Sequence, residues 1–308
     1  MIEILKNPNF DFLGKTKYFI SLSLLLIFGG IAYMLGTGVY LGANAKGYGV
    51  EFSGGTQLIL RFEKQPEADR IRAAVPDATI QTYDDPAKNQ MIVRLAAAVE
   101  GKLDEAANAA RAAIAAQYPE NKILESSSEI VGATVGADLR QKAVLLTVWG
   151  LVFQLIYITW RFGGAIWGAA ATLAVFHDVL VTLALLAFFQ YDITLNIIAA
   201  LLTLVGYSVN DTIVIFDRAR ENLKGRRKDS LAKILNDSLN QTLTRTLISN
   251  GTTFLAVLGL YLFGGEVLRG FGFTMVVGII VGTYSTIYIA SPVVIWWENR
   301  NAKKTTTA

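Results

Sequence analysis

The sequence predicts an α-helical polytopic membrane protein with six transmembrane helices and one exported α+β domain. Of its 308 residues, 53% are hydrophobic and only 17% are charged, whereas soluble domains carry about 25% charged residues. The apolar residues concentrate in segments of the length, about 20 residues, that a helix needs to cross a bilayer. These segments cover roughly residues 18–36, 142–160, 164–188, 193–216, 243–263 and 270–296.

The positions of Lys and Arg predict how these helices are oriented. Basic residues precede the first helix, fill the segment 218–242 and recur in the tail 297–308, whereas the opposite short loops contain only Arg269. Because basic flanks stay in the cytoplasm, both termini are predicted to be cytoplasmic. The predicted parts are an N-terminus with the first helix (1–36), an exported domain (37–141), a five-helix bundle (142–296) with its basic loop (218–242), and the tail.

The first apolar segment could be mistaken for a secretory signal, because Ala43-Asn44-Ala45 resembles a cleavage site. Its apolar run from Tyr18 to Leu35 is longer than the roughly 7–15 residues of a signal peptide's apolar region. We therefore expect a retained anchor helix.

The exported segment has the patterns of a mixed α+β domain. Its first strand is expected at 56–62, where Leu58, Leu60 and Phe62 alternate with polar residues. An Ala-rich helix is expected at 104–117, with Asp104 as its N-cap. The other expected elements are a helix at 67–75 and strands at 79–83, 90–95 and 122–129. This order matches a ferredoxin-like split βαβ unit.

Asp211 is the main candidate functional residue because it lies inside the fourth apolar segment. An Asp at the centre of a spanning helix costs about 2.5–3.5 kcal/mol on insertion scales, so such residues are usually functional. Helical spacing gives it four neighbours on one stripe: Tyr207, Ser208, Ile215 and Arg218.

The fifth apolar segment carries a second polar stripe, made of Thr242, Arg245, Ser249, Thr252 and Ala256. The long side chain of Arg245 could extend toward Asp211. The functional interpretation is an embedded carboxylate that loads and releases a proton as the helices move. The alternative is a static buried ion pair between two helices, and periodicity alone does not show that the two side chains meet.

Other motifs predict no cofactor. His177-Asp178 lies inside the third helix, but the chain has a single His and no Cys, so a hydrogen-bonded structural or relay role is favoured over a metal site. The run Ser53-Gly54-Gly55-Thr56 lacks the Gly-Lys-Ser/Thr ending of a nucleotide-binding loop, and we expect a turn there. No nucleophile elbow or ATPase motif occurs, so we expect no enzyme. The Lys and Arg of 224–228 are attributed to topology rather than to anionic lipid or RNA.

Several of these runs resemble one known family. Val50-Glu51-Phe52-Ser53-Gly54-Gly55-Thr56 is similar to the signature turn of SecD and SecF, the accessory subunits of the bacterial Sec translocase. Phe176-His177-Asp178 matches as well. Gly206-Tyr207-Ser208-Val209-Asn210-Asp211-Thr212 resembles the SecF form. The resemblance covers essentially the whole chain.

The resemblance implies an RND-type transporter half that is completed by SecD. It implies that Asp211 and Arg245 form the proton pathway, with Asn210, Ser249 and Asp178 as weaker candidates. Phe52, Ser53, Gly54, Gly55 and Thr56 would form the signature turn. The implied partners are SecD, the SecYEG translocon, YajC, the emerging polypeptide and membrane lipids, without nucleic acid, and the implied location is the bacterial inner membrane.

The resulting hypothesis is a Sec translocase subunit that couples the proton-motive force to the completion of protein export. An RND-type half-transporter of lipids or small amphiphiles is the first alternative, and a passive assembly scaffold is the second. Replacing Asp211 by Asn separates a coupling subunit from a scaffold.

Overall fold

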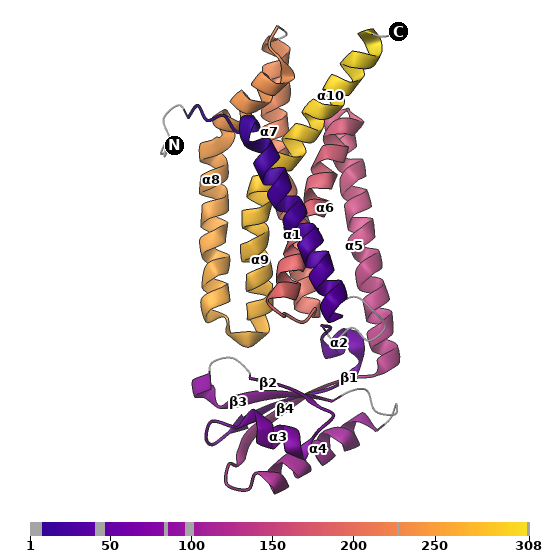
Figure 1. The fold of residues 1–308 in the computed structure, drawn as a ribbon, viewed down its shortest axis with the longest axis vertical. Coiled ribbons are helices and arrows are strands. Elements are labelled where there is room, and N and C mark those ends of the chain that lie inside the picture. The colour runs from indigo at the N-terminus through magenta and orange to yellow at the C-terminus, as the bar shows by residue number, and fades with distance from the viewer. Residues whose placement is uncertain (1–7, 41–46, 83–85, 96–101, 227, 307–308) are drawn as a thin grey trace. The chain divides into compact units, whose positions relative to one another are not determined.

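The computed structural model describes residues 8–40, 47–82, 86–95, 102–226 and 228–306, and the chain forms two compact units (Figure 1). One unit consists of membrane-type helices. The other is an α+β unit made of Gly47–Leu145 together with Asp192–Leu195.

Six long apolar spans confirm the predicted transmembrane helices. A short 3₁₀ turn, η1, opens the first span, and the sixth span consists of three consecutive elements. The spans are η1 (Leu13–Lys15) with α1 (Thr16–Thr37), α5 (Ala133–Phe162), α6 (Ala165–Phe188), α7 (Leu195–Gly225), α8 (Leu231–Phe263), and α9 (Gly265–Ser285) with η3 (Thr286–Ala290) and α10 (Ser291–Thr306).

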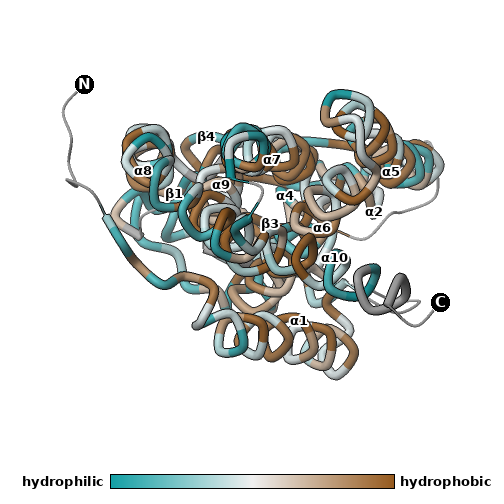
Figure 2. Tube along the Cα trace, turned by 90° about the horizontal axis from the view of Figure 1, so that it is seen from above, coloured by the Kyte–Doolittle hydropathy of each residue, from teal (hydrophilic) through white to brown (hydrophobic). Residues whose placement is uncertain are grey.

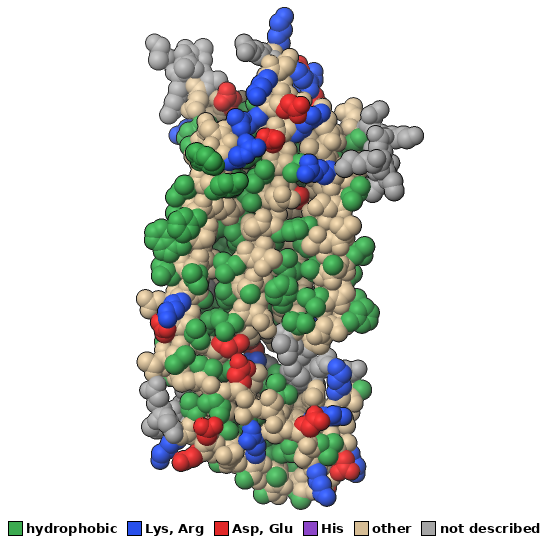
Figure 3. All heavy atoms as spheres, turned by 180° about the vertical axis from the view of Figure 1, so that it is seen from behind, with side chains coloured by type: hydrophobic (Ala, Val, Ile, Leu, Met, Phe, Trp, Pro, Cys, Tyr) green, Lys and Arg blue, Asp and Glu red, His purple; other side chains and the backbone are tan. Residues whose placement is uncertain are grey.

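The spans differ in how deeply they are buried in the helical unit. Helices α6, α7 and the sixth span are about half buried or more, whereas α1, α5 and α8 are mostly exposed. Large apolar side chains such as Leu25, Phe153 and Leu255 lie on these outer helices and are exposed. Hydrophobic residues are brown along the helices in Figure 2, and hydrophobic side chains are green on the surface of the helices in Figure 3. An apolar exterior around a packed core is typical of a bundle surrounded by lipid.

The sixth span is not the single α-helix that the apolar segment 270–296 suggested. A π-helical turn, η3, separates α9 from α10. Hydroxyl groups bond to backbone carbonyls at this turn: Thr286 Oγ1 donates to Gly282 O (3.0 Å), and Ser291 Oγ donates to Thr286 O (3.0 Å). Such back-bonding bends helices, and single π turns often occur at functional sites.

The basic segment 218–242, predicted as a loop, is mainly helical. Helix α7 continues to Gly225 and α8 begins at Leu231, where Ser230 caps the helix by accepting the Lys233 N–H. This hairpin lies at the same end of the helical unit as the start of α1 and the end of α10 (Figure 1). Arg227 lies outside the described residues.

The α+β unit has the predicted ferredoxin-like topology. Its sheet has the order β2-β3-β1-β4, and all neighbouring strands are antiparallel. Leu58, Leu60 and Phe62 of β1 point into a core that is covered by α3 and α4. Helix α4 begins at Leu103 with Lys102 as the N-cap residue, so the N-cap predicted at Asp104 was wrong. The elements are β1 (Gly55–Phe62), α3 (Ala68–Ala74), β2 (Thr79–Thr82), η2 (Pro86–Lys88), β3 (Gln90–Leu95), α4 (Leu103–Gln117) and β4 (Ile123–Val131).

A glycine turn joins the short helix α2 (Val50–Ser53) to β1. Gly54 has φ +71° and ψ 163°, a conformation that is almost restricted to glycine. A Cβ atom at Gly54 would lie 2.6 Å from Cα of Ala133, at the start of α5. Gly136 is equally confined, since its Cβ would lie 2.9 Å from the Gly54 nitrogen. The signature turn is therefore a close backbone contact with the first turn of α5.

The α6–α7 connection belongs to the α+β unit. Ile193 forms a parallel bridge with Tyr48, in which Ile193 N–H donates to Gly47 O (2.7 Å) and Gly49 N–H donates to Ile193 O (2.9 Å). Asp192 forms an ion pair with Arg94 of β3, and both side chains are largely buried. Residues 192–195, at the end of the α6–α7 connection and the start of α7, are thus fixed within this unit by backbone bonds and by charge.

Candidate functional site

Asp211 lies in the interior of the helical unit. Its residue is 5% exposed, and Ser208 and Ile215, which share its face of α7, are also buried. The stripe predicted around Asp211 therefore faces inward. Asn210, one position earlier, is exposed. The helix thus presents one polar, buried face to the bundle and a different face to the outside.

Asn250 of α8 provides the hydrogen bond to this carboxyl group. Its Nδ2 donates to Asp211 Oδ2 (2.5 Å) and to Thr283 Oγ1 of α9 (2.7 Å). Its Oδ1 accepts from the Tyr207 hydroxyl (3.0 Å). Three helices therefore meet at one amide, and a small displacement of α8 would change the environment of the carboxyl group.

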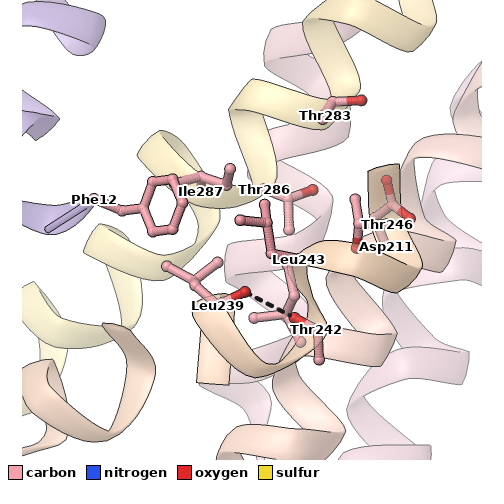
Figure 4. Close-up of a pocket in the computed structure, with 10 residues that line it drawn as sticks. Phe12, Asp211, Leu239, Thr242, Leu243, Thr246, Thr283, Thr286 and Ile287 are labelled. Carbon is pink, nitrogen blue, oxygen red and sulfur yellow. Dashed lines mark hydrogen bonds between the residues drawn. The ribbon is translucent and has the colours of Figure 1, made fainter. Parts of the chain in front are cut away.

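A small cleft adjoins Asp211, and its cavity volume of about 10 Å³ is of the order that one water molecule needs. Figure 4 shows the hydroxyl-bearing side chains between the carboxyl group and the apolar residues of the cleft. The cleft is lined by Phe12, Asp211, Ile215, Leu239, Thr242, Leu243, Thr246, Thr283, Thr286 and Ile287. A carboxyl group beside several threonine hydroxyls forms a polar site within an apolar bundle.

The π turn η3 contributes directly to this cleft. Thr286, its first residue, lines the cleft, and its Oγ1 lies 3.0 Å from Thr212 Oγ1 of α7. Thr212 follows Asp211 in the chain, so η3 contacts α7 at the level of the carboxyl group. The irregular backbone of the sixth span is therefore part of the site.

Asp178 forms a second buried carboxyl centre. Its Oδ2 accepts from Ser208 Oγ (2.5 Å) and Ser285 Oγ (2.9 Å), and its Oδ1 lies 2.9 Å from His177 Nδ1. The chain of contacts continues from His177 Nε2 to the Tyr284 hydroxyl (3.2 Å). The relay or structural role predicted for His177-Asp178 is consistent with this network, which links α6, α7 and α9.

The second predicted stripe, on α8, is divided: Thr242 is buried and Ser249 half-buried, whereas Arg245, Thr252 and Ala256 are exposed. Arg245 acts on Asp211 electrostatically, but the two side chains form no ion pair within 4.0 Å among the described residues. Ser249 contributes its backbone carbonyl, which accepts from Tyr207 at 3.3 Å. The buried polar face of α8 beside Asp211 comprises Thr242, which belongs to that stripe, together with Thr246 and Asn250, which do not, at a regular spacing of four residues.

Asn250 is a site residue that the sequence analysis does not predict. A signal for it exists, because a polar residue recurs at every fourth position from Thr242 to Asn250. The stripe with Arg245 competes with this pattern, since it contains a cation that could pair with Asp211. In this conformation an amide, and not a guanidinium, makes the contact.

Comparison with known proteins identifies the family. Residues 112–300 match the family model for the C-terminal part of the protein export membrane proteins SecD and SecF. The chain belongs to the SecD/SecF family. A protein translocase subunit SecF from Calditerrivibrio nitroreducens is 40% identical over 95% of this chain and 96% of its own length. Family members of this kind are subunits of a protein translocase, which supports a role in Sec translocation.

A relative named SecDF also matches. The protein translocase subunit SecDF of Thermus thermophilus is 37% identical over 96% of this chain. The crystal structure of the Thermus SecDF, described as a translocon-associated membrane protein, superposes with a TM-score of 0.82 at 35% identity. The superposition includes 95% of this chain but only 39% of the longer SecDF chain. Its fold therefore corresponds to one part of a longer family member.

Proposed function

We propose that this chain is the SecF-type subunit of a Sec translocase and that it couples proton movement through the membrane to the export of polypeptide. Family membership supports the Sec role. The buried position of Asp211, with its single amide donor and its hydroxyl-lined cleft, supports the coupling to protons. An intramembrane carboxyl group of this kind is a functional site by default.

The proposed step is a change of contacts at Asp211. With the carboxylate ionised, the Asn250 amide compensates part of its charge. Protonation weakens that hydrogen bond, because bonds to charged groups are the stronger ones, and α8 becomes free to shift against α7. One charge that crosses the membrane releases about 2.3 kcal/mol per 100 mV. This energy suffices to bias a two-state movement, since 1.4 kcal/mol changes an equilibrium about tenfold.

Arg245 enters the proposal as a residue of another conformational state. It lies on α8, five positions before Asn250, and its side chain is exposed here. A rotation of α8 would exchange the Asn250 contact for the Arg245 guanidinium. Asp178 of α6 and Ser208 of α7 extend the proposed pathway. Ser249 contributes through its backbone carbonyl, and Asn210 lies on the outer surface of α7.

The outer face of α7 suggests where a SecD-type partner binds. Thr203, Gly206 and Asn210 are exposed and fall on one side of the helix. Polar side chains are costly in lipid, and small residues let spanning helices approach closely. The relative that carries the SecDF name joins both types in one chain, so we propose a SecD-type chain on this face. SecYEG and YajC are proposed as further partners, with the emerging polypeptide as substrate and membrane lipids around the helices.

The proposed location is the bacterial inner membrane, with both termini in the cytoplasm. The basic α7–α8 hairpin would lie inside, and the α+β unit would lie outside, where it contacts the emerging polypeptide. The Lys and Arg distribution supports this orientation.

The deciding experiment compares Asp211→Asn with Asp217→Asn. Asp217 lies on the same helix but is exposed, so it controls for loss of a carboxylate at another position. We expect Asp211→Asn to abolish the dependence of export on the proton-motive force in inverted membrane vesicles, and Asp217→Asn to retain it. If export keeps its full proton dependence without Asp211, the chain is a scaffold and not a coupling subunit.

A further inference from the structure

The described segment that precedes α1 is held against α8 by two asparagines. Phe10 N–H donates to Asn240 Oδ1 (2.8 Å), and Asn240 Nδ2 donates back to Phe10 O (2.9 Å). Phe12 N–H donates to Asn236 Oδ1 (3.0 Å), and Asn236 Nδ2 donates to Phe10 O (3.0 Å). Asn236 and Asn240 lie one helical turn apart on α8, so their side-chain amides together bind the backbone groups of Phe10 and Phe12. We name residues 8–12 the N-terminal segment.

This attachment places the Phe12 side chain in the cleft that adjoins Asp211. In Figure 4 the Phe12 ring and the Asp211 carboxyl group lie at opposite sides of the cleft, with threonine side chains between them. The ring lies beside Leu239 and Ile287, so the side of the cleft away from Asp211 is apolar. Phe10 of the same segment does not line the cleft, and its residue is 51% exposed.

The side of the cleft near Asp211 suits water. Asp211 Oδ1 and Thr246 Oγ1 make no hydrogen bond to another described residue, although both residues are largely buried. Thr283 and Thr286 donate their hydroxyl hydrogens to backbone carbonyls, so each oxygen keeps acceptor capacity. Buried polar groups with spare capacity and adjoining space are normally satisfied by ordered water.

We propose that the N-terminal segment is a lid over a water site beside Asp211, and that Phe12 is the residue that closes it. The proposal rests on the proposed proton-coupling function, and it adds the element that controls when water reaches the carboxyl group. With the segment clamped by Asn236 and Asn240, the Phe12 ring closes the mouth. When the clamp opens, water connects Asp211 with the side of the membrane on which the N-terminal segment lies.

The test measures access to the cleft directly. The chain contains no cysteine, so Thr246→Cys introduces a single thiol on the cleft wall. Its labelling rate with a small, charged methanethiosulfonate reagent is measured on full-length protein in inverted membrane vesicles. Gln241→Cys, at an exposed position of α8, reports the general reactivity of the helix.

Three variants are then compared in the Thr246→Cys background. Phe12→Ala removes the ring, and Asn236→Ala with Asn240→Ala frees the segment while the ring remains. Both are expected to raise the labelling rate at least about tenfold, because the net loss of a hydrogen bond or of a packed ring shifts an equilibrium by that order. Asn9→Ala is the control, since Asn9 belongs to the same segment, is exposed and does not line the cleft, and it is expected to leave the rate unchanged. Phe10 is unsuitable because its ring packs against the Phe12 ring, with the centroids 5.8 Å apart.

Equal labelling rates in the Thr246→Cys protein and in either opening variant overturn the lid proposal. An equal increase with Asn9→Ala, or at Gln241→Cys, also overturns it, because the increase then reflects general loosening of α8. The readout does not require export. If labelling responds as expected while Asp211→Asn leaves proton-dependent export intact, the coupling function fails and the lid stands. If labelling is insensitive while Asp211→Asn abolishes coupling, only the lid fails.

Discussion

The side-chain amide of Asn250 donates a hydrogen bond of 2.5 Å to Asp211, and it connects helix α8 to helix α7 at a buried carboxyl group of the proposed pathway. The same amide group contacts Tyr207 and Thr283. One asparagine thereby fixes the relative position of three helices around a titratable group.

Replacing Asn250 by Ala should impair proton coupling. A hydrogen bond to a charged group contributes about 1.5–3 kcal/mol, so we expect a decrease of about tenfold or more in export driven by the proton-motive force. Thr252→Ala, at an exposed position of the same helix, is the control and should retain activity. Export kinetics in inverted vesicles measure both, and full coupling in Asn250→Ala would exclude a role for this contact.

Gly54→Ala should destabilise the α+β unit. The left-handed backbone conformation at Gly54 costs a residue with a side chain about 1–3 kcal/mol, and the new Cβ would also collide with Ala133. The midpoint temperature of thermal unfolding and the protease resistance of the full chain should both decrease. Gly259→Ala, whose Cβ would meet nothing within 4 Å, should be neutral or slightly stabilising. Similar stability of the two variants would contradict the assigned turn.

Glu129 predicts a pH dependence of the α+β unit. Partial burial and the repulsion of Glu51 raise its pKa above the usual value near 4.5, against the opposing effect of Arg94. A carboxyl group whose folded pKa is raised contributes stability below the unfolded pKa and loses it as the pH rises through the folded pKa. Glu129→Gln should therefore stabilise the unit at neutral pH, by a fraction of about 1 kcal/mol because solvent screens this half-exposed group.

Hydrogen exchange of the β4 amides at pH 4 and pH 7.5 checks this effect. Slower exchange in Glu129→Gln at pH 7.5, and a smaller difference at pH 4, is the expected result. Glu125→Gln is the matched control on the same strand, because Glu125 is exposed and pairs with Arg61. If Glu129→Gln slowed exchange more at pH 4 than at pH 7.5, the predicted sign would be wrong.

The ion pair between Arg94 and Asp192 should hold the α6–α7 connection in the α+β unit. Removing one partner leaves the other charge largely buried, which costs on the order of 1–3 kcal/mol. Arg94→Gln and Asp192→Asn should each accelerate hydrogen exchange at the Ile193 amide, which bonds to Gly47. The double exchange Arg94→Asp with Asp192→Arg should recover part of the protection. If the double exchange recovered no protection and its effect equalled the sum of the two single effects, the two charges would not be coupled.

The sequence was most informative where a single physical rule decides the structure. The six apolar spans follow from the length of a bilayer-crossing helix, and the alternation of Leu58, Leu60 and Phe62 placed β1 and its buried face correctly. Asp211 was identified because charge is costly in lipid. In each case the free-energy cost of the wrong placement depends on the residue type alone, so the sequence suffices to predict the placement.

The parts that could not be predicted depend on choices between similar alternatives. Helix α8 carries polar residues on two faces, and only packing against α7 and α9 selects the face with Thr246 and Asn250. Within 218–242, Arg226 of the turn between α7 and α8 pairs with Asp229 and with Asp237 of α8, so charge that is typical of a solvated loop lies in a helical hairpin. Neither effect has a periodic signature of its own.

The π turn η3 has a consequence for how the last membrane segment is interpreted. A π turn holds one residue more than an α turn, and one residue corresponds to about 100° around a helix. Side chains after Ala290 therefore point about a quarter-turn away from the directions that α9, continued as an ideal helix, would assign to them. A helical wheel drawn through the whole segment therefore misplaces the residues of α10 by about a quarter-turn. Alignments that delete or insert one position here would rotate the entire C-terminal helix, so this single turn fixes which surface the chain's end presents.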